Sequence, residues 1–423
     1  MNRHFSQAIA LSVTTLLLFS GAACSLPFQE KKVSAQDLSA QYVRQATDNG
    51  AVTETFKNAM SQFSVSLLQN TLTVDTNNDL VSPLSAAQCL ALIANGANGN
   101  TLTQLEGLFG GMPIAEFNQA SYAYTSSLYT ANDCQVNLAN SLWIQENTAE
   151  ILPDFLQTNA DWYGAQAYRV PFDQTTLSDI NHWCYNKTKG KIDKILDSID
   201  RNTVMYLINA LDFDAKWQVK YENSDVSNYT FYNATKNTST VKMLFSDESC
   251  YLEDGEDAIG FAKAYKGGKY SFVGILPNES DGYSADIYEY VNGLTGKRWQ
   301  EMWNNRKSRS VKAGIPEFTY RTNMMLNDAL QALGVTDMFD AAVADFSNMS
   351  ETDALYCSFI KQKTFIQVDR NGTKAAAITL GGMKGTSIAP NEPIRIVLER
   401  PFVYAIVDNA NGLPLFLGVV SHL

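Results

Sequence analysis

The sequence predicts a single α+β domain. Segments with helical spacing of apolar residues dominate the early part of the chain, and segments typical of strands dominate the late part. No internal repeat and no linker divides the 423 residues. Because 45% of the residues are apolar, with abundant Tyr and Phe, the chain can bury a sizeable core.

Apolar residues recur at helical spacing in four segments. We expect helices over residues 52–70, 86–94, 180–196 and 324–333. Ser82 or Ser85 is placed to cap the second helix, and residues 95–101 end it and start another. The third helix is expected to break near 189–191, and Gly334 stops the fourth.

Strands are expected wherever short apolar or β-branched runs are bounded by turn residues. They cover residues 140–144, 204–213, 270–276, 311–320 and 364–368. The chain ends in a predicted hairpin, 402–407 and 415–420, around the Asn411-Gly412 turn.

Small residues follow the strand at 364–368. Read at the two-residue period of a strand, residues 373–384 have one small, uncharged face and one face with both lysines. The small face holds Thr373, Ala375, Ala377, Thr379, Gly381 and Met383. Because a buried charge would cost several kcal/mol, its absence there would let this segment slide between two strands. A flexible Gly/Ala linker is the alternative.

Composition excludes several functions. The net charge is −12, and no Lys or Arg occurs between Lys57 and Arg169, which argues against nucleic acid or polyanions as partners. His182 is the one histidine away from both chain ends, and catalytic and nucleotide-binding motifs are missing, so we expect no enzyme and no cofactor.

We expect no metal site, since Asp337, Asp340 and Asp345 lack the spacing of a calcium loop. The five cysteines after Cys24 lack a C-x-x-C pattern and are expected to be buried free thiols.

The N-terminus has the pattern of an export signal. Residues 1–23 carry Arg3, an apolar run and small residues before Cys24, which indicates a signal peptide. The small residues before Cys24 are similar to a bacterial lipoprotein cleavage site, although Gly21 stands where Leu is usual. We expect lipidation at Cys24, a tether over 24–48, the folded domain over 49–423, and a location on a bacterial membrane, periplasmic or extracellular.

Several separated motifs then point to one family. In chain order they are SPLS at 82–85, NSLW at 140–143, NKTKGKI at 186–192, LINA at 207–210, KW at 216–217, GVTDMF at 334–339, ADFS at 344–347, GTKAAA at 372–377, RPF at 400–402 and LFLG at 415–418. Together they resemble the serpins, the serine protease inhibitor superfamily, from about residue 50 to residue 423. The resemblance implies about nine helices around three β-sheets, with an exposed reactive-centre loop at about 371–393.

The resemblance also implies a mechanism. A serpin holds its reactive loop as bait in a metastable fold; a protease cleaves it and forms an acyl-enzyme, and the loop then inserts into the central sheet and distorts the protease. The implied hinge is Gly372, Thr373, Lys374, Ala375, Ala376 and Ala377.

The usual loop length puts the reactive bond at Thr386-Ser387, with Ser387-Ile388, Met383 and Lys384 as other sites. Thr386 suits elastase-like or subtilisin-like proteases, and Lys384 would suit trypsin-like ones. Papain-like cysteine proteases are a further class of target, and the chain is expected to be a monomer.

Two departures from the family pattern carry expectations of their own. The sheet-opening region would contain Ser82, Ser85 and Asn209, with Gln362 where relatives commonly have His. Gln can donate and accept, so we expect it to bridge the other three and to make sheet opening insensitive to pH between 5 and 8.

The second departure is an exchange of charge near Trp217. Arg370 stands where the family has Glu, and Glu317 where it has Lys, so we expect an inverted ion pair at the top of the sheet. The alternatives to an inhibitor are a non-inhibitory serpin that binds ligands or assists folding, and a surface adhesin.

Overall fold

A computed structural model describes residues 28–38, 41–46, 50–73, 78–128, 134–146, 150–201, 203, 205–279, 286–351, 355–373 and 392–423. Its α-helices are α1 (Glu54–Gln69), α2 (Pro83–Ala94), α3 (Gly99–Leu108), α4 (Ile114–Leu128), α5 (Pro153–Tyr163), α6 (Gln174–Lys187), α7 (Ile287–Gly293), α8 (Gly296–Asn304) and α9 (Asn327–Ala332). No helix in this described part is long and apolar enough to cross a membrane.

Most of the strands follow the first six helices along the chain. The strands are β1 (Gln36–Asp37), β2 (Asp79–Val81), β3 (Cys134–Gln145), β4 (Gln166–Val170), β5 (Met205–Lys216), β6 (Val226–Tyr232), β7 (Thr238–Asp254), β8 (Ala258–Ala264), β9 (Tyr270–Pro277), β10 (Lys307–Pro316), β11 (Phe318–Met325), β12 (Lys361–Val368), β13 (Gly372–Thr373), β14 (Ile394–Val397), β15 (Phe402–Asp408) and β16 (Pro414–Val420).

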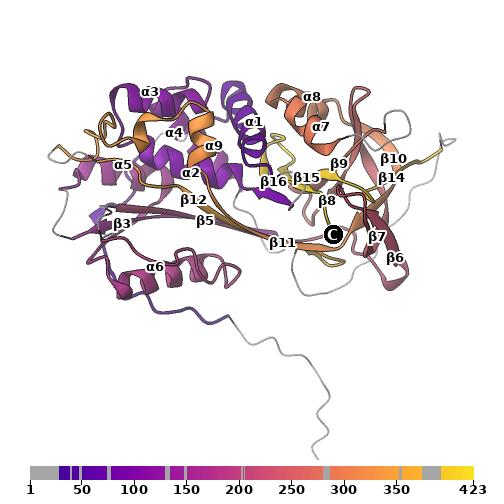
Figure 1. Ribbon diagram of the computed structural model, residues 1–423, viewed down its shortest axis with the longest axis horizontal. Helices are drawn as coiled ribbons and strands as arrows, with labels where there is room; N and C mark the ends of the chain where they lie inside the picture. Colours follow the sequence, from indigo (N-terminus) through magenta and orange to yellow (C-terminus); the bar gives the residue numbers. More distant parts are fainter. Residues whose placement is uncertain are drawn as a thin grey trace, which may run out of the picture.

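Hydrogen bonds join the described strands into three groups. One has the order β1-β4-β3-β5-β13, the second is the pair β11-β12, and the third runs β14-β10-β7-β8-β9-β15-β16-β2, with β6 on β7. In Figure 1 the first two groups lie side by side as the central sheet. Helices α2 to α5 and α9 lie on one side of it and α6 on the other. The expected α+β fold is confirmed, with nine α-helices and three hydrogen-bonded groups of strands among the described residues.

The two faces of the central sheet have separate hydrophobic clusters. The larger one lies between the sheets and most of the helices and includes Phe213 and Ala215 of β5. The smaller one includes Ile180 and Trp183 of α6 and Ile208 of β5. Alternate residues of β5 therefore face opposite clusters, as the pleat of a strand requires.

Three predicted elements differ from the observed ones. The strand expected at 311–320 is two strands, because Glu317 leaves the ladder between β10 and β11 and its N–H donates to the carbonyl of Lys242 at 2.7 Å. The helix expected at 324–333 begins later, since residues 324 and 325 pair with β12. The helix expected at 180–196 begins earlier, at Gln174, and ends at Lys187. The break predicted near 189–191 is confirmed by the positive φ angles of Lys189 and Gly190, but no helix follows it over residues 192–196.

The segment expected as a tether packs against the body over its described part. The N–H groups of Lys31 and Ser34 donate to Asn186 and Asp179 of α6, at 2.8 and 2.9 Å. Strand β1 then pairs with β4 at the edge of the central sheet. Main-chain bonds of this kind fix the chain, so residues 28–38 belong to the folded domain rather than to a free linker.

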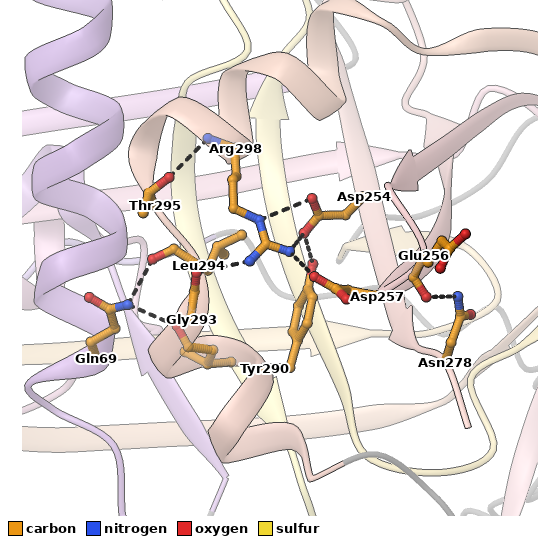
Figure 2. Close-up of polar contacts among 11 residues, drawn as sticks. Gln69, Asp254, Glu256, Asp257, Asn278, Tyr290, Gly293, Leu294, Thr295 and Arg298 are labelled. Atoms are coloured by element: carbon orange, nitrogen blue, oxygen red, sulfur yellow. Dashed lines mark hydrogen bonds and ion pairs between the residues drawn. The ribbon is translucent and has the colours of Figure 1, made fainter. Parts of the chain in front are cut away.

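A polar cluster fastens α7 and α8 to the neighbouring elements (Figure 2). The Arg298 guanidinium donates to both oxygens of Asp254, at 3.2 and 2.8 Å, and pairs with Asp257 at 2.6 Å. Tyr290 also donates to Asp254, at 2.9 Å. Gln69 of α1 donates to main-chain carbonyls around the end of α7. This end of the molecule is therefore held by charge-assisted hydrogen bonds as well as by packing.

Asp79 is a buried carboxylate three residues before Ser82. Its Oδ1 accepts hydrogen bonds from the N–H and hydroxyl of Thr73, at 3.1 and 2.8 Å. Its Oδ2 is buried without a hydrogen-bond partner among the described residues. Burial raises the pKa of Asp79 to about 6, and the bonds from Thr73 only partly oppose this. The next residue, Leu80, accepts hydrogen bonds from Thr322 and Thr364 of the β11-β12 pair.

We predict that Asp79 makes the fold less stable as pH rises. A raised folded-state pKa contributes stability below the unfolded value, and this contribution is lost as pH rises through about 6. A shift of about two units corresponds to about 3 kcal/mol. Asp79→Asn should raise the urea midpoint at pH 8 and leave it nearly unchanged at pH 4.

The exposed Asp247 of β7 provides the control for this experiment. Asp247→Asn should shift the midpoint little at pH 8. An Asp79→Asn shift of equal size at pH 4 and pH 8 would contradict the prediction, because it could not come from ionisation of Asp79.

Candidate functional site

The hinge begins as a strand against the edge of β5. Gly372 lies opposite Lys216 and Thr373 opposite Ala215, in antiparallel register. The Trp217 N–H donates to the carbonyl of Asn371 at 3.1 Å, one residue before this pairing. The first two residues of the predicted hinge are thus already in the ladder of β5.

Glycine is required at position 372 by the closeness of β5. The φ angle of Gly372 is +147°, and a Cβ atom there would lie 2.2 Å from the carbonyl oxygen of Ala215. No side chain can occupy that space without moving the strand. The sequence pattern found this glycine, and the contact gives the physical reason for it.

Beyond β13, no hydrogen bonds join β5 to β12 among the described residues. These two strands belong to different hydrogen-bonded groups. A cavity of about 200 Å³ lies between the beginning of β5 and residues 355–359, and apolar side chains such as Ile93 line most of it. A smaller hollow of about 20 Å³ is bordered by Asn209 of β5 and Gln362 of β12. The site is therefore a partly filled slot that could take another strand.

The predicted sheet-opening residues lie around this smaller hollow, but they form two sets of contacts. Gln362 accepts from the N–H of Ser82 at 3.0 Å and donates to its carbonyl at 2.9 Å. The Ser85 hydroxyl donates instead to Asn209, which donates to Asn140 of β3 at 2.6 Å. The expected bridge from Gln362 to all three residues is therefore found only for Ser82 within the described residues.

Ser82 occupies the N-cap position of α2 without capping it through its side chain. Its hydroxyl donates to the carbonyl of Leu415 in β16 at 2.9 Å. Ser82 thus connects β12, α2 and β16. Of the two residues expected to cap the helix, Ser82 is the N-cap residue, but its side chain does not bond to the first turn of α2.

Trp217 lies at the top of the slot and holds the chain that leads into the hinge. Its indole N–H donates to the carbonyl of Asp369 at 2.8 Å. Its ring stacks on Tyr265 at 4.6 Å between centroids. Because Trp217 is buried, this contact fixes the place where β12 turns into β13.

Glu317 and Arg370 lie next to each other, as the exchange of charges predicts. Arg370 Nε is 3.9 Å from Glu317 Oε1, and the Arg370 N–H donates to the same oxygen at 3.3 Å. The guanidinium also donates to Asn223 at 2.6 Å. Both side chains are partly exposed, so the ionic part of this contact is weak.

Sequence reasoning missed a buried ion pair beside Trp217. Lys263 Nζ lies 2.8 Å from Glu248, and both side chains are nearly buried. The ammonium group is also 4.4 Å from the ring centroid of Tyr221 and 5.5 Å from that of Trp217. The two residues lie on the adjacent antiparallel strands β7 and β8. They are fifteen residues apart in the sequence, and no local motif links them.

Several predicted site residues lie outside the described residues. They are Lys374, Ala375, Ala376 and Ala377 of the hinge, Thr386 and Ser387 of the reactive bond, and Cys24. Thr373 is described only as the last residue of β13.

The chemistry available in the described part is limited. Groups of His, Cys, Asp and Glu that could hold a metal are not found among those residues. All five cysteines after Cys24 are free thiols, of which Cys250 and Cys357 are partly exposed, so the expectation of burial is correct for three. Burial raises the pKa of Cys89, Cys134, Cys184 and Cys357 to about 12, so these remain neutral thiols near pH 7.

We predict that the charges of Glu317 and Arg370 are coupled. Glu317→Lys and Arg370→Glu should each lower the unfolding midpoint, and the double variant should recover most of the loss. The coupling should be ~0.2–1 kcal/mol, because the pair is partly exposed. Glu317→Gln is the control, since it keeps the acceptor for the Arg370 N–H and removes only the charge. A double variant no better than the worse single variant would contradict the coupling.

Comparisons with known proteins agree with this geometry. The family model described as "Serpin (serine protease inhibitor)" matches residues 58–423. Human leukocyte elastase inhibitor is 29% identical over 384 residues, which cover 87% of this chain and 99% of that protein. The mouse leukocyte elastase inhibitor A has the same identity over 380 residues.

Solved structures give the same result. The thermophilic serpin tengpin in its native state is 40% identical, with a TM-score of 0.85, and the match covers 92% of this chain and 100% of that one. Tengpin in its latent state matches with a TM-score of 0.78 at 39% identity, covering 90% and 100% of the two chains. The match of the family model to most of the chain, on a fold with the same central sheet, shows that this protein belongs to the serpin family and is not an enzyme.

Proposed function

We propose that this protein inhibits serine proteases as a suicide substrate, by inserting its cleaved reactive loop into the slot between β5 and β12. The observation that carries the proposal is the pairing of Gly372 and Thr373 with β5. That pairing sets the direction and register of a new strand, and the slot beside it is not closed by hydrogen bonds between β5 and β12. Relatives named leukocyte elastase inhibitors support serine proteases as the class of target.

The composition of the loop supports insertion. On the register of β13, an inserted Ala375 would share a face with Phe213, which belongs to the large core cluster. An inserted Ala376 would share the opposite face with Asp212. The small face of the loop would therefore enter the larger core cluster, and the face with the lysines would lie on the α6 side of the sheet, beside Asp212 and Asp214.

The proposed reactive bond is Thr386-Ser387, and the proposed targets are elastase-like or subtilisin-like enzymes. Incubation with elastase-, subtilisin-, trypsin- and papain-like proteases tests this. We expect an adduct with a serine protease that survives denaturing gels, with a new N-terminus mapped by mass to 383–388. Cleavage without an adduct or loss of protease activity, across the whole panel, would contradict inhibition and favour a non-inhibitory serpin. Resistance of residues 372–390 to every protease of the panel would favour a surface adhesin.

We predict that a charge on the small face converts the inhibitor into a substrate. Ala375→Lys should abolish the adduct while cleavage continues, because the ammonium would have to enter the core at a cost of several kcal/mol. Ala376→Lys is the matched control and should keep the adduct, because its charge would lie near Asp212. Equal adduct yields from the two variants would show that the faces are not distinguished.

We also propose that the chain is an exported lipoprotein, anchored through Cys24. The apolar run and the small residues before Cys24 support this. Cys24→Ser should move the protein, expressed in a bacterium that processes lipoproteins, from the detergent-rich to the aqueous phase in a detergent partition. Wild-type protein in the aqueous phase, cleaved at another residue, would contradict the anchor and leave the inhibitor proposal intact.

A further inference from the structure

The chain that follows α6 makes a tight turn and directs a lysine at β5. Lys189 and Gly190 have φ angles of +49° and +80°. The Thr188 hydroxyl accepts from the N–H of Ile192 at 3.1 Å, which closes the turn. Lys191 therefore lies in a turn of defined backbone directly after α6, and α6 lies on one side of the central sheet (Figure 1).

Lys191 has three acceptors on three consecutive residues of β5. Its ammonium group pairs with Asp212, donates to the carbonyl of Phe213 at 3.2 Å and pairs with Asp214 at 3.3 Å. The Lys191 side chain is 9% exposed and that of Asp212 is fully buried. A lysine with so little water depends on all three acceptors, so the contact is a strong one.

The carbonyl of Phe213 points to the edge of β5 that an inserting strand would use. In an antiparallel ladder, residues whose main-chain groups face the same partner strand occur at every second position. The Trp217 N–H bonds to Asn371, which is directly opposite in the register of β13. Ala215 and Phe213 are the next two residues of this set. The Phe213 carbonyl is therefore the acceptor that β13 would need next after Ala215.

We propose that Lys191 is a latch on the insertion slot: its ammonium group covers the Phe213 carbonyl and, with Asp212 and Asp214, holds the turn after α6 beside the path of the inserting strand. Extension of β13 beyond Thr373 brings a main-chain N–H to this carbonyl, where it competes with the Lys191 ammonium group. The latch rests on the proposed insertion mechanism and makes Lys191 a positioning residue that sets the rate of insertion.

The charges around the ammonium group fit this role. Asp212 also accepts from the side chain of Asn137 in β3 at 3.2 Å, so it stays fixed in the sheet when Lys191 leaves. Burial raises the pKa of Asp214, and Lys191 opposes that effect. Lys189 donates to Gln135 of β3, which ties the same turn to the next strand.

Uptake of a synthetic peptide copying residues 372–385 by the intact protein tests the latch. Uptake reports insertion into the slot without a protease. Lys191→Met should take up the peptide about tenfold faster than the wild type. Lys194→Met is the matched control, because Lys194 lies in the same segment but is 51% exposed and pairs with Asp197 rather than β5. It should take up the peptide at the wild-type rate.

A second variant distinguishes release of the latch from destabilisation of the fold. Lys191→Met leaves the buried Asp212 without its cation, which can destabilise the fold. The double variant Lys191→Met/Asp212→Asn removes both charges and keeps an acceptor for Asn137, and it should also take up the peptide about tenfold faster. Unchanged uptake by the double variant, with its thermal stability retained, would overturn the latch and leave Lys191 as a structural anchor of α6.

The outcomes also separate the latch from the proposed function. Faster uptake by both Lys191 variants supports the latch even if no protease in the panel forms an adduct. An adduct with wild-type uptake rates in both variants supports inhibition and overturns the latch. No uptake by any variant overturns the latch, because release of Lys191 would then not open the slot.

Discussion

The described structure depends on a central sheet in which β5 and β12 are not joined by hydrogen bonds. A strand edge presents main-chain donors and acceptors at every second residue, and these are costly to bury without partners. The protein meets this constraint in two ways within its described part. Gly372 and Thr373 pair with the top of β5, and the Lys191 side chain supplies a hydrogen bond lower down. The side chain of Gln362, in turn, ties β12 to the main chain of Ser82.

This arrangement gives the slot two kinds of neighbour. On the core side, apolar residues such as Ile93 and Leu207 line a cavity that an added strand could fill. On the other side, α6 and the turn after it lie across β5 and are attached by charge. In the proposed mechanism, filling the cavity and completing the ladder would both favour insertion, whereas the polar contacts of Lys191 would oppose it.

Aromatic packing stabilises the top of the slot, whereas charged contacts stabilise its middle. Trp217 stacks on Tyr265 and binds the carbonyl of Asp369, so the turn from β12 to β13 is fixed by aromatic packing. The neighbouring Lys263–Glu248 pair is buried and must stay paired. The Glu317–Arg370 contact is partly exposed and contributes less.

The sequence by itself determined the fold class, the family and the positions of most elements. Periodicity located α1 and α2, and short motifs located the hinge glycine, Trp217 and the exchanged charges of Glu317 and Arg370. These features are local or depend on family motifs, so a single chain can reveal them. The break at Glu317 and the late start of α9 were not predicted, because pairing of β10 and β11 with other strands overrides local pattern.

Only the tertiary structure decided which polar groups meet inside the fold. Lys191 and Asp212 are 21 residues apart, and Asp79 is buried by strands from the other end of the chain. Nothing in the local sequence distinguishes these charged residues from exposed ones, because burial depends on packing between distant segments. For the same reason, the sequence indicated that Gln362 would replace a histidine, but the fold determined that it binds Ser82 and not Asn209.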